Sequence, residues 1–237
     1  MNSIQHNLKI FLKLLLSPIK LKIRSGPMKG MRWIATSGSK FILGNYEPEK
    51  TQAIVENVKE GDIVYDIGAH VGYFSILMSR LVGDKGHIYS FEPRPLTHHF
   101  LKTHVRVNHR ENITVTNACV GDKAGKVTFE TRTGTGTSHL SDSGNIEADM
   151  VVLDELHKRG DLPAPNFIKI DVEGGEMVVL KGMKNILDKF HPTIIVATHG
   201  DEIHEETMTF LSKIGYKFFP IEQLKGDVET LAIYTMT

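Results

Sequence analysis

Short apolar runs alternate with helical repeats from about residue 60 to the end of the chain. Strands are predicted at Ile63–Ile67, His87–Phe91, Ile113–Val120, Phe167–Ile170, Thr193–Ala197, Tyr216–Pro220 and Leu231–Met236. Helical spacing predicts helices at Tyr73–Leu81, Pro95–Val107, Glu176–Lys189 and Thr207–Ile214. This alternation is typical of an α/β fold with a mostly parallel sheet and helices on both faces. Ligands bind such sheets at the carboxyl ends of the strands, so the residues directly after each strand are candidate site residues.

Two stretches depart from this alternation. Between Gly121 and Asp161, Lys126–Thr131 fits a strand, and small residues dominate 133–138. We interpret residues 132–148 as an insertion near the ligand-binding edge, which is either a lid or a solvent loop. Residues 4–16 show apolar positions at helical spacing, with Lys9 and Lys13 off that stripe and Pro18 beyond it. This helix is too short to span a bilayer and fits a secretory signal poorly.

The charge distribution bears on that N-terminal helix. The chain of 237 residues is neutral, but residues 1–46 hold eight basic side chains and no acidic one. Such asymmetry suggests contact with a membrane or a nucleic acid. Residues 4–24 could therefore lie on an anionic membrane; the alternative is packing on the domain or on a second subunit. We divide the chain into a basic amphipathic segment (1–24), a pre-domain with substrate-side elements (25–59) and a catalytic domain (60–237).

Overall composition is that of an ordinary globular protein, with 41% hydrophobic and 24% charged residues. The single cysteine, Cys119, excludes an intramolecular disulfide and a site built from several cysteines. It agrees with a reducing compartment. We expect a cytoplasmic protein, with peripheral contact at the inner face of a membrane as a further hypothesis.

The first strand and the turn after it predict a cofactor site. Gly68 and Gly72 surround the turn into the next helix, where a missing Cβ lets a ligand approach the backbone. Glu92 ends the second strand, 24 residues beyond Gly68, near the spacing at which an acid binds a ribose diol. The turn lacks the G-x-G-x-x-G fingerprint of dinucleotide sites, and Asp66 would repel a pyrophosphate. S-adenosylmethionine, which is cationic, suits these residues better; the alternative is that Asp66 only caps the helix.

Several motifs together resemble one family. They are Asp66-Ile-Gly-Ala-His-Val-Gly-Tyr-Phe-Ser75, Phe91-Glu-Pro93, Ile168-Lys-Ile-Asp-Val-Glu-Gly-Gly-Glu176 and Leu180-Lys-Gly-Met183, with Gly44-Asn-Tyr-Glu47 and Val152-Leu-Asp-Glu-Leu156 flanking them. In this order they resemble the FkbM family of class I methyltransferases over roughly residues 40–220.

The resemblance implies a Rossmann-like fold with a seven-stranded sheet. It also implies S-adenosylmethionine as methyl donor and O-methylation of a sugar, glycan or small metabolite. The positions it places along the methionine part of the cofactor are Asp66, Gly68, Ala69, His70, Gly72 and Tyr73. Glu92 would take the ribose hydroxyls and Pro93 would flank the adenine. Asn117 and Cys119 would border the adenine, with Cys119 as a cavity wall and not a nucleophile.

The reaction centre is predicted at the ends of two later strands. Asp171, Glu173 and Glu176 follow one strand, and His199 follows the next. A hydroxyl acceptor must lose a proton during methyl transfer. We therefore assign Asp171 to binding and orienting the cofactor and the acceptor, and either Glu173 or His199 to receiving the hydroxyl proton. Glu176 could serve the reaction or satisfy amides at its helix N-terminus.

Two further features concern the same strand ends. A divalent metal on Asp171, Glu173, His199 and Asp201 is a rival mechanism, although their spacing matches no metal motif, and we predict none. In the FkbM pattern the fifth strand often ends in an acid two residues before the histidine, where this chain has Ala197.

Other functions remain as alternatives. One is a nicotinamide-dependent sugar oxidoreductase, and another is a non-catalytic membrane-associated module that binds the cofactor or a glycan. A nucleic-acid substrate is not expected, because the catalytic region is acidic and lacks an aromatic and basic stripe. His98, His99, His104 and His109 are interpreted as surface or packing residues. Trp33 either lines an acceptor pocket or anchors the N-terminal segment. The sequence does not indicate the oligomeric state.

Overall fold

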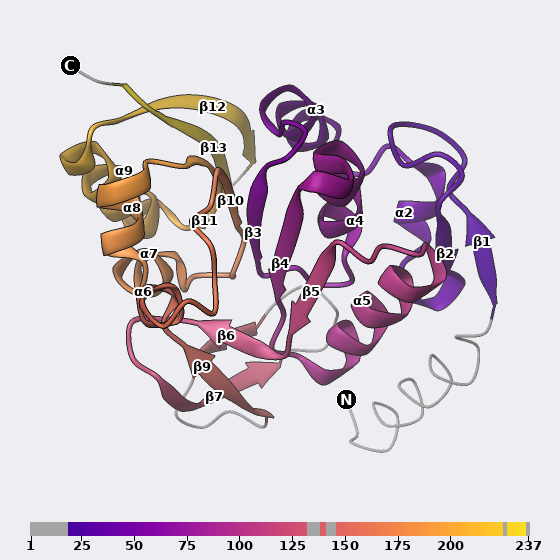
Figure 1. The fold of residues 1–237 in the computed structure, drawn as a ribbon, viewed down its shortest axis with the longest axis horizontal. Helices are drawn as coiled ribbons and strands as arrows, with labels where there is room; N and C mark the ends of the chain where they lie inside the picture. The colour runs from indigo at the N-terminus through magenta and orange to yellow at the C-terminus, as the bar shows by residue number, and fades with distance from the viewer. Residues whose placement is uncertain (1–18, 132–137, 141–145, 225–226, 236–237) are drawn as a thin grey trace.

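The computed structural model describes residues 19–131, 138–140, 146–224 and 227–235. The helix expected at residues 4–16 and most of the insertion expected at 132–148 lie outside them. A seven-stranded sheet forms the centre of the molecule (Figure 1). Its strands, in spatial order, are β12 (Tyr216–Leu224), β13 (Asp227–Tyr234), β11 (Thr193–His199), β10 (Phe167–Ile170), β3 (Ile63–Ile67), β4 (His87–Phe91) and β5 (Ile113–Thr116).

The direction of the strands confirms the predicted fold class. β11, β10, β3, β4 and β5 are parallel to one another, whereas β13 pairs antiparallel with both β11 and β12 at one side. The order reverses beside β3, because the chain first extends the sheet through β4 and β5 and then continues on the other side with β10. Such a reversal leaves a crevice at the carboxyl ends of the adjacent strands, which is where open parallel sheets bind ligands.

Helices cover both faces of this sheet. The α-helices are α2 (Ser39–Leu43), α3 (Pro48–Asn57), α4 (Tyr73–Val82), α5 (Pro95–Val107), α6 (Leu153–Lys158), α7 (Glu176–Lys181), α8 (Lys184–Phe190) and α9 (Asp201–Ile214). Two short 3₁₀ helices occupy Ala35–Ser37 and Gly83–Lys85. Successive side chains of β3 enter opposite cores: Val64 packs with α3 and α4, whereas Tyr65 and Ile67 pack with α7 and α8.

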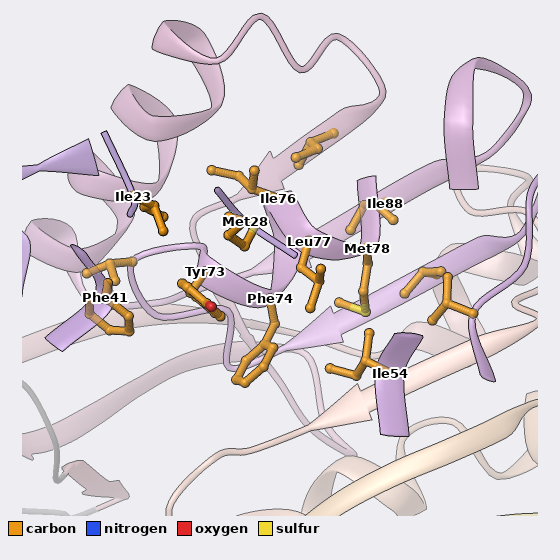
Figure 2. Packing of buried hydrophobic residues seen from close by; sticks show 14 of the residues in the cluster. Ile23, Met28, Phe41, Ile54, Tyr73, Phe74, Ile76, Leu77, Met78 and Ile88 are labelled. Carbon is orange, nitrogen blue, oxygen red and sulfur yellow. The ribbon is translucent and has the colours of Figure 1, made fainter. Parts of the chain in front are cut away.

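The first of these cores also receives the N-terminal elements. β1 (Lys20–Lys22) and β2 (Arg32–Ile34) form an antiparallel ribbon at the edge of the molecule (Figure 1). Ile23, Met28 and Phe41 are buried in the same cluster as Tyr73 and neighbouring side chains of α4 (Figure 2). Residues 19–57 therefore share a core with the sheet. No helix in the described ranges is long and apolar enough to cross a bilayer.

Two predicted elements were too long. The strand expected at Ile113–Val120 breaks at Asn117, and the residues after it form β6 (Ala118–Val120) in a second sheet with β9 (Ile146–Val151), β7 (Gly125–Thr131) and β8 (Ser138–Leu140). The helix expected at Glu176–Lys189 divides into α7 and α8 at Gly182. A Cβ on Gly182 would lie 1.9 Å from the carbonyl oxygen of Gly121, so this close approach requires glycine.

The remaining boundaries moved by a few residues. α9 begins at Asp201, six residues before the predicted start, and β12 continues to Leu224. β11 extends to His199, so the histidine ends the strand itself. The predicted division at residues 24 and 59 remains a prediction.

Candidate active site

A cavity of about 860 Å³ lies at the carboxyl ends of β3, β4, β10 and β11. It is large enough for a cofactor together with an acceptor. Most of the predicted residues line it: Gly68, Ala69, His70, Tyr73, Glu92, Pro93, Cys119, Asp171, Glu173 and His199. Asp66, Gly72 and Asn117 do not. The N-terminal elements contribute Lys40, Phe41, Tyr46, Glu47 and Lys50 to the opposite wall.

Glu92 places a buried carboxylate on the cavity wall. Only 4% of the residue is exposed, and its oxygens accept hydrogen bonds from the backbone N–H groups of His70 (2.8 Å) and Arg94 (3.0 Å) and from the Thr97 hydroxyl (2.7 Å). Burial raises the pKa of Glu92, and these hydrogen bonds oppose that rise. A carboxylate fixed in this way can accept hydrogen bonds from a ribose diol, as the sequence predicted.

The two glycines of the turn after β3 were expected to let a ligand approach the backbone. In the structure, both allow close contact between elements of the protein itself. Gly68 adopts φ +78°, and a Cβ there would lie 1.9 Å from the carbonyl oxygen of Asp171. The glycine thus allows the ends of β3 and β10 to meet at the cavity. Gly72 begins α4, and a Cβ there would lie 2.3 Å from Leu101. Its expected contact with the cofactor is therefore replaced by close packing of α4 against α5.

Asp66 corrects the sequence prediction. The side chain is fully buried beneath the turn, where it accepts a hydrogen bond from the Ser75 hydroxyl at 2.5 Å and pairs with Lys169 at 3.2 Å. It does not lie along the methionine part of the cavity, because Lys169 holds it below the wall. Lys169 also donates to the carbonyl oxygen of Gly68 at 3.1 Å. Asp66 can therefore act on the cofactor only by holding Lys169 and the turn.

Of the two residues predicted to border the adenine, one lines the cavity and the other does not. Asn117 is exposed and donates to the carbonyl oxygens of Glu92 (2.8 Å) and Pro93 (3.0 Å), so it fixes this backbone from outside the cavity. Cys119 lines the cavity. Burial raises the pKa of its thiol to about 12. A protonated thiol is a poor nucleophile, which agrees with its prediction as a wall residue.

The three predicted catalytic residues meet at one point of the cavity. His199 Nε2 lies 3.9 Å from an Asp171 carboxylate oxygen and 3.8 Å from one of Glu173. Glu173 adopts φ +57°, a left-handed conformation that costs a residue with a Cβ about 1 kcal/mol or more. The following Gly174 has φ +99°. This loop thereby carries the Glu173 carboxylate from the end of β10 toward His199 on β11.

The Glu176 carboxylate is directed to the loop before α7 and to His199, and not to the amides of the helix that it begins. One oxygen of its fully buried carboxylate accepts from the Gly174 N–H at 3.0 Å and lies 2.7 Å from His199 Nδ1. Burial alone would lower the pKa of His199, but the hydrogen bond and charge of Glu176, with the charges of Asp171 and Glu173, raise it to about 9. Nε2 is left facing the cavity.

Two buried lysines that the sequence analysis missed neutralise Asp171. Lys50 Nζ pairs with Asp171 (3.1 Å), Glu47 (2.6 Å) and Glu229, and Lys169 Nζ lies 3.8 Å from Asp171. Burial alone would raise the pKa of Asp171, but the two ammonium groups and His199 hold it well below its usual range. Burial alone would lower the pKa of Lys50, and the surrounding carboxylates raise it well above the usual value. Both groups are therefore charged.

Glu229 lies beside Ala197, the position at which the FkbM pattern often has an acid. In the antiparallel register of β11 and β13, Glu229 is the partner of Ala197. Both residues line the cavity. A carboxylate is thus present beside Ala197, supplied by the neighbouring strand. Lys169 could have been noticed as a charge between Ile168 and Ile170 of a buried strand, whereas nothing local to the sequence of α3 or β13 marks Lys50 or Glu229.

Asp171, Glu173 and His199 each offer a ligand atom within 4.8 Å of the others, so the described residues do bring together a possible metal triad. Asp201 is not part of it. The electrostatics are unfavourable for a divalent cation, because Lys50 and Lys169 both approach Asp171. The absence of a metal requirement stays a prediction.

The histidines of α5 include one with a structural role. His104 is fully buried, stacks on Trp33 with ring centroids 3.7 Å apart, and lies 3.0 Å from the Ile34 N–H and 2.8 Å from the Val71 carbonyl. Burial lowers its pKa to about 4, so the ring is neutral. Trp33 is therefore an anchor of the N-terminal segment and lies outside the cavity lining, whereas Tyr46 lines the cavity.

Comparison with known proteins gives the family. Residues 66–218 match the family described as the methyltransferase FkbM domain. The hexuronic acid methyltransferase AglP of Haloferax volcanii is 30% identical over 171 residues, which are 70% of this chain and 68% of that protein.

Solved structures give the fold. An FkbM methyltransferase from Methylobacillus flagellatus has a TM-score of 0.58 at 15% identity, over 97% of this chain and 59% of that one. Precorrin-6y C5,15-methyltransferase from Geobacter metallireducens has a TM-score of 0.54 at 17% identity, over 79% and 88% of the two chains. Fibrillarin from Aeropyrum pernix, solved with S-adenosyl-L-methionine bound, has a TM-score of 0.51 at 18% identity, over 77% and 73%.

The fold, the turn with its buried acid and the family match agree with one another. The sheet order is that of a class I methyltransferase, with a cavity at its switch point, and the chain belongs to the FkbM methyltransferase family.

Proposed function

We propose that this methyltransferase transfers the methyl group of S-adenosylmethionine to a hydroxyl of a sugar or glycan, with His199 as the proton acceptor. The convergence of His199, Asp171 and Glu173 at one end of a cavity whose other end holds Glu92 carries this proposal. The family match and the similarity to a hexuronic acid methyltransferase support it.

The residues at the cofactor end suit this donor. Glu92 offers a buried acceptor for ribose hydroxyls, and Gly68, which also lines the cavity, lets the ends of β3 and β10 approach each other there. When bound, S-adenosylmethionine supplies an electrophilic methyl group on a positively charged sulfur. Carboxylates outnumber cationic side chains on the cavity wall, which favours a cationic ligand.

His199 is a better candidate for the base than Glu173. The buried carboxylate of Glu176 fixes the imidazole through Nδ1, so Nε2 is the nitrogen that can take a proton from an acceptor hydroxyl. Glu173 and Asp171 can stabilise the imidazolium that results. Because Lys50 and Lys169 keep Asp171 ionised and positioned, Asp171 serves as an orienting group.

A glycan containing a hexuronic acid is the first acceptor to test, because the relative from Haloferax volcanii methylates a hexuronic acid. At the acceptor wall, Lys40 is exposed, and its ammonium group lies 4.3 Å from the centre of the Tyr46 ring. It could meet the carboxylate of such a sugar. The sugar oxidoreductase alternative is less favoured, since the dinucleotide fingerprint is missing and the family is one of methyltransferases.

The experiment separates cofactor binding from transfer. His199→Gln should lower kcat by roughly 10²–10⁴-fold while leaving the Kd of S-adenosylhomocysteine within a few-fold, since the imidazole acts on the acceptor. Glu92→Gln should instead weaken S-adenosylhomocysteine binding in calorimetry. If His199→Gln and wild type turned over at the same rate, the base assignment would be wrong; nicotinamide dinucleotide binding in place of S-adenosylhomocysteine would reject the donor.

A further inference from the structure

One surface of the N-terminal elements carries positive charge alone. Six basic side chains between residues 19 and 46 are all exposed, and no acidic residue precedes Glu47. They are Lys20, Lys22, Arg24, Lys29, Arg32 and Lys40. Residues 47–237, by contrast, hold more acidic than basic side chains, so the excess of positive charge is confined to the N-terminal part of the chain.

Within this surface, two cations are placed directly against each other. Lys22 of β1 and Arg32 of β2 are cross-strand partners. The backbone N–H and C=O of Arg32 both bond to the Asn108 side chain, at 2.7 and 2.9 Å, so they do not face β1. The pair is therefore of the narrow type, whose Cα atoms lie about 4.5 Å apart, and like charges opposed in this way destabilise a ribbon.

The ribbon cannot relieve this repulsion easily. Asn108 fixes the outer side of β2, the Ile34 N–H bonds to His104, and the Ala35 N–H donates to the Ile19 carbonyl at 3.0 Å. Lys20 points to the same face as Lys22 because it lies two residues away in the strand. Among the residues that the structure describes, no carboxylate pairs with any of these three cations. A fixed and uncompensated triad of cations is suited to an anionic partner.

The exposed hydrophobic side chains of this segment distinguish between an anionic bilayer and a nucleic acid as its partner. Of the four large hydrophobic residues that are exposed in the described ranges, three belong to this segment: Ile19, Leu21 and Leu43. Leu21 alternates with Lys20 and Lys22 along β1, and all three side chains are exposed, so the two faces of this strand carry basic and aliphatic side chains respectively. A bilayer that meets the edge of the strand contacts both kinds, which is the combination favoured at an anionic membrane interface. Single-stranded nucleic acid would instead favour exposed aromatic side chains for stacking, and the aromatic residues of this segment are not fully exposed.

We propose that the exposed edge of the β1–β2 ribbon, which carries Lys20, Lys22 and Arg32 together with Leu21, docks on an anionic lipid bilayer. The neighbouring α2 contributes Lys40 to the cavity wall, so the docking surface and the acceptor end of the cavity belong to the same N-terminal elements. Docking would present the cavity to acceptors held at the membrane. The lipid contact itself does not depend on which acceptor is methylated.

Charge reversal at Lys22 tests this proposal, because it should weaken lipid binding without lowering the thermal stability of the protein. In Lys22→Glu, the cross-strand repulsion becomes an attraction, so the Tm should stay equal or rise slightly. Binding of the full chain to vesicles of phosphatidylcholine with phosphatidylserine should fall by roughly tenfold or more, since each basic residue near such a surface contributes about fivefold. Lys217→Glu is the matched control, on edge strand β12 at the far side of the molecule (Figure 1).

Sedimentation with these vesicles, and with vesicles of phosphatidylcholine alone, gives a decisive result. The proposal expects binding only to the anionic vesicles, weakened by Lys22→Glu and by added salt and unchanged by Lys217→Glu, with S-adenosylhomocysteine affinity the same in all three proteins. Equal vesicle binding by Lys22→Glu and wild type would overturn it. Preferential binding to single-stranded RNA over anionic vesicles would overturn it as well.

Discussion

At the scale of single residues, charged pairs between neighbouring strands determine where each acidic side chain of the site lies. Glu92, Asp171, Glu173 and His199 reach the cavity as expected, because they follow strands directly. Asp66 lies beneath it, because it pairs with Lys169, which comes from another strand. Such a pairing depends on strand order and is invisible in the local sequence. For the same reason, the sequence named Glu176 as a candidate but did not show that it pairs with His199.

The pair formed by Glu176 and His199 predicts the pH dependence of methyl transfer. With a His199 pKa of about 9, the neutral base is scarce at neutral pH, so kcat should rise with pH, reach half its maximum near pH 9 and level off above it. Glu176→Gln removes the neighbouring charge and should move the profile about 1 to 2 pH units lower. The exposed Glu205→Gln should leave it unchanged. If kcat instead rose with pH in the acid range in which carboxylic groups titrate, Glu173 would be the base.

Gly68 should be intolerant of any side chain. Gly68→Ala places a Cβ 1.9 Å from the Asp171 carbonyl oxygen, whereas Gly160→Ala, at a similar φ of +84°, meets nothing within 4 Å. The control should lose about 1 kcal/mol of unfolding free energy through backbone strain alone. Gly68→Ala should lose about 2 kcal/mol more and bind S-adenosylhomocysteine more weakly. Equal urea midpoints for the two variants would show that β3 and β10 do not approach so closely.

At the scale of elements, periodicity predicted the strands and helices between residues 63 and 107 almost to their ends. It failed where tertiary contact ends an element. The third strand stops because Asn117 binds the carbonyls after β4, and the long helix stops because Gly182 contacts the Gly121 backbone. Asn and Gly are residues that often interrupt strands and helices, but the contacts that set these two breaks join segments far apart in the sequence.

Lys50 is the residue that joins α3 to the strands of the site. Its ammonium group pairs with carboxylates on β13 and directly after β10, and only 2% of the side chain is exposed. Lys50→Met would leave these carboxylates uncompensated, so we expect a loss of about 3–5 kcal/mol in unfolding free energy. Lys184→Met, which removes an exposed pair with Asp188, should cost less than about 1 kcal/mol. Urea unfolding at neutral pH measures both, and similar losses would contradict the burial of this charge.

At the scale of the whole molecule, the sequence predicted the fold class and the family, because motifs after successive strands keep their order when the sheet forms. It predicted substrate-side elements at residues 25–59, but not which of their side chains reach the cavity or that these residues share a core with the catalytic region. The cavity wall that they form is built from side chains whose partners lie more than a hundred positions later, such as Lys50 and Asp171. The basic N-terminal part is thus joined to the acidic catalytic part at the acceptor end.

The most direct test of the account is the product itself. The full chain would be incubated with methyl-labelled S-adenosylmethionine and a glycan that contains a hexuronic acid, and the sugar would be analysed by mass spectrometry. We predict one labelled methyl group on a sugar hydroxyl, with equimolar S-adenosylhomocysteine, and no product with His199→Gln under the same conditions. A methylated carboxylate or nitrogen, or label transfer that is equal with His199→Gln, would contradict the account.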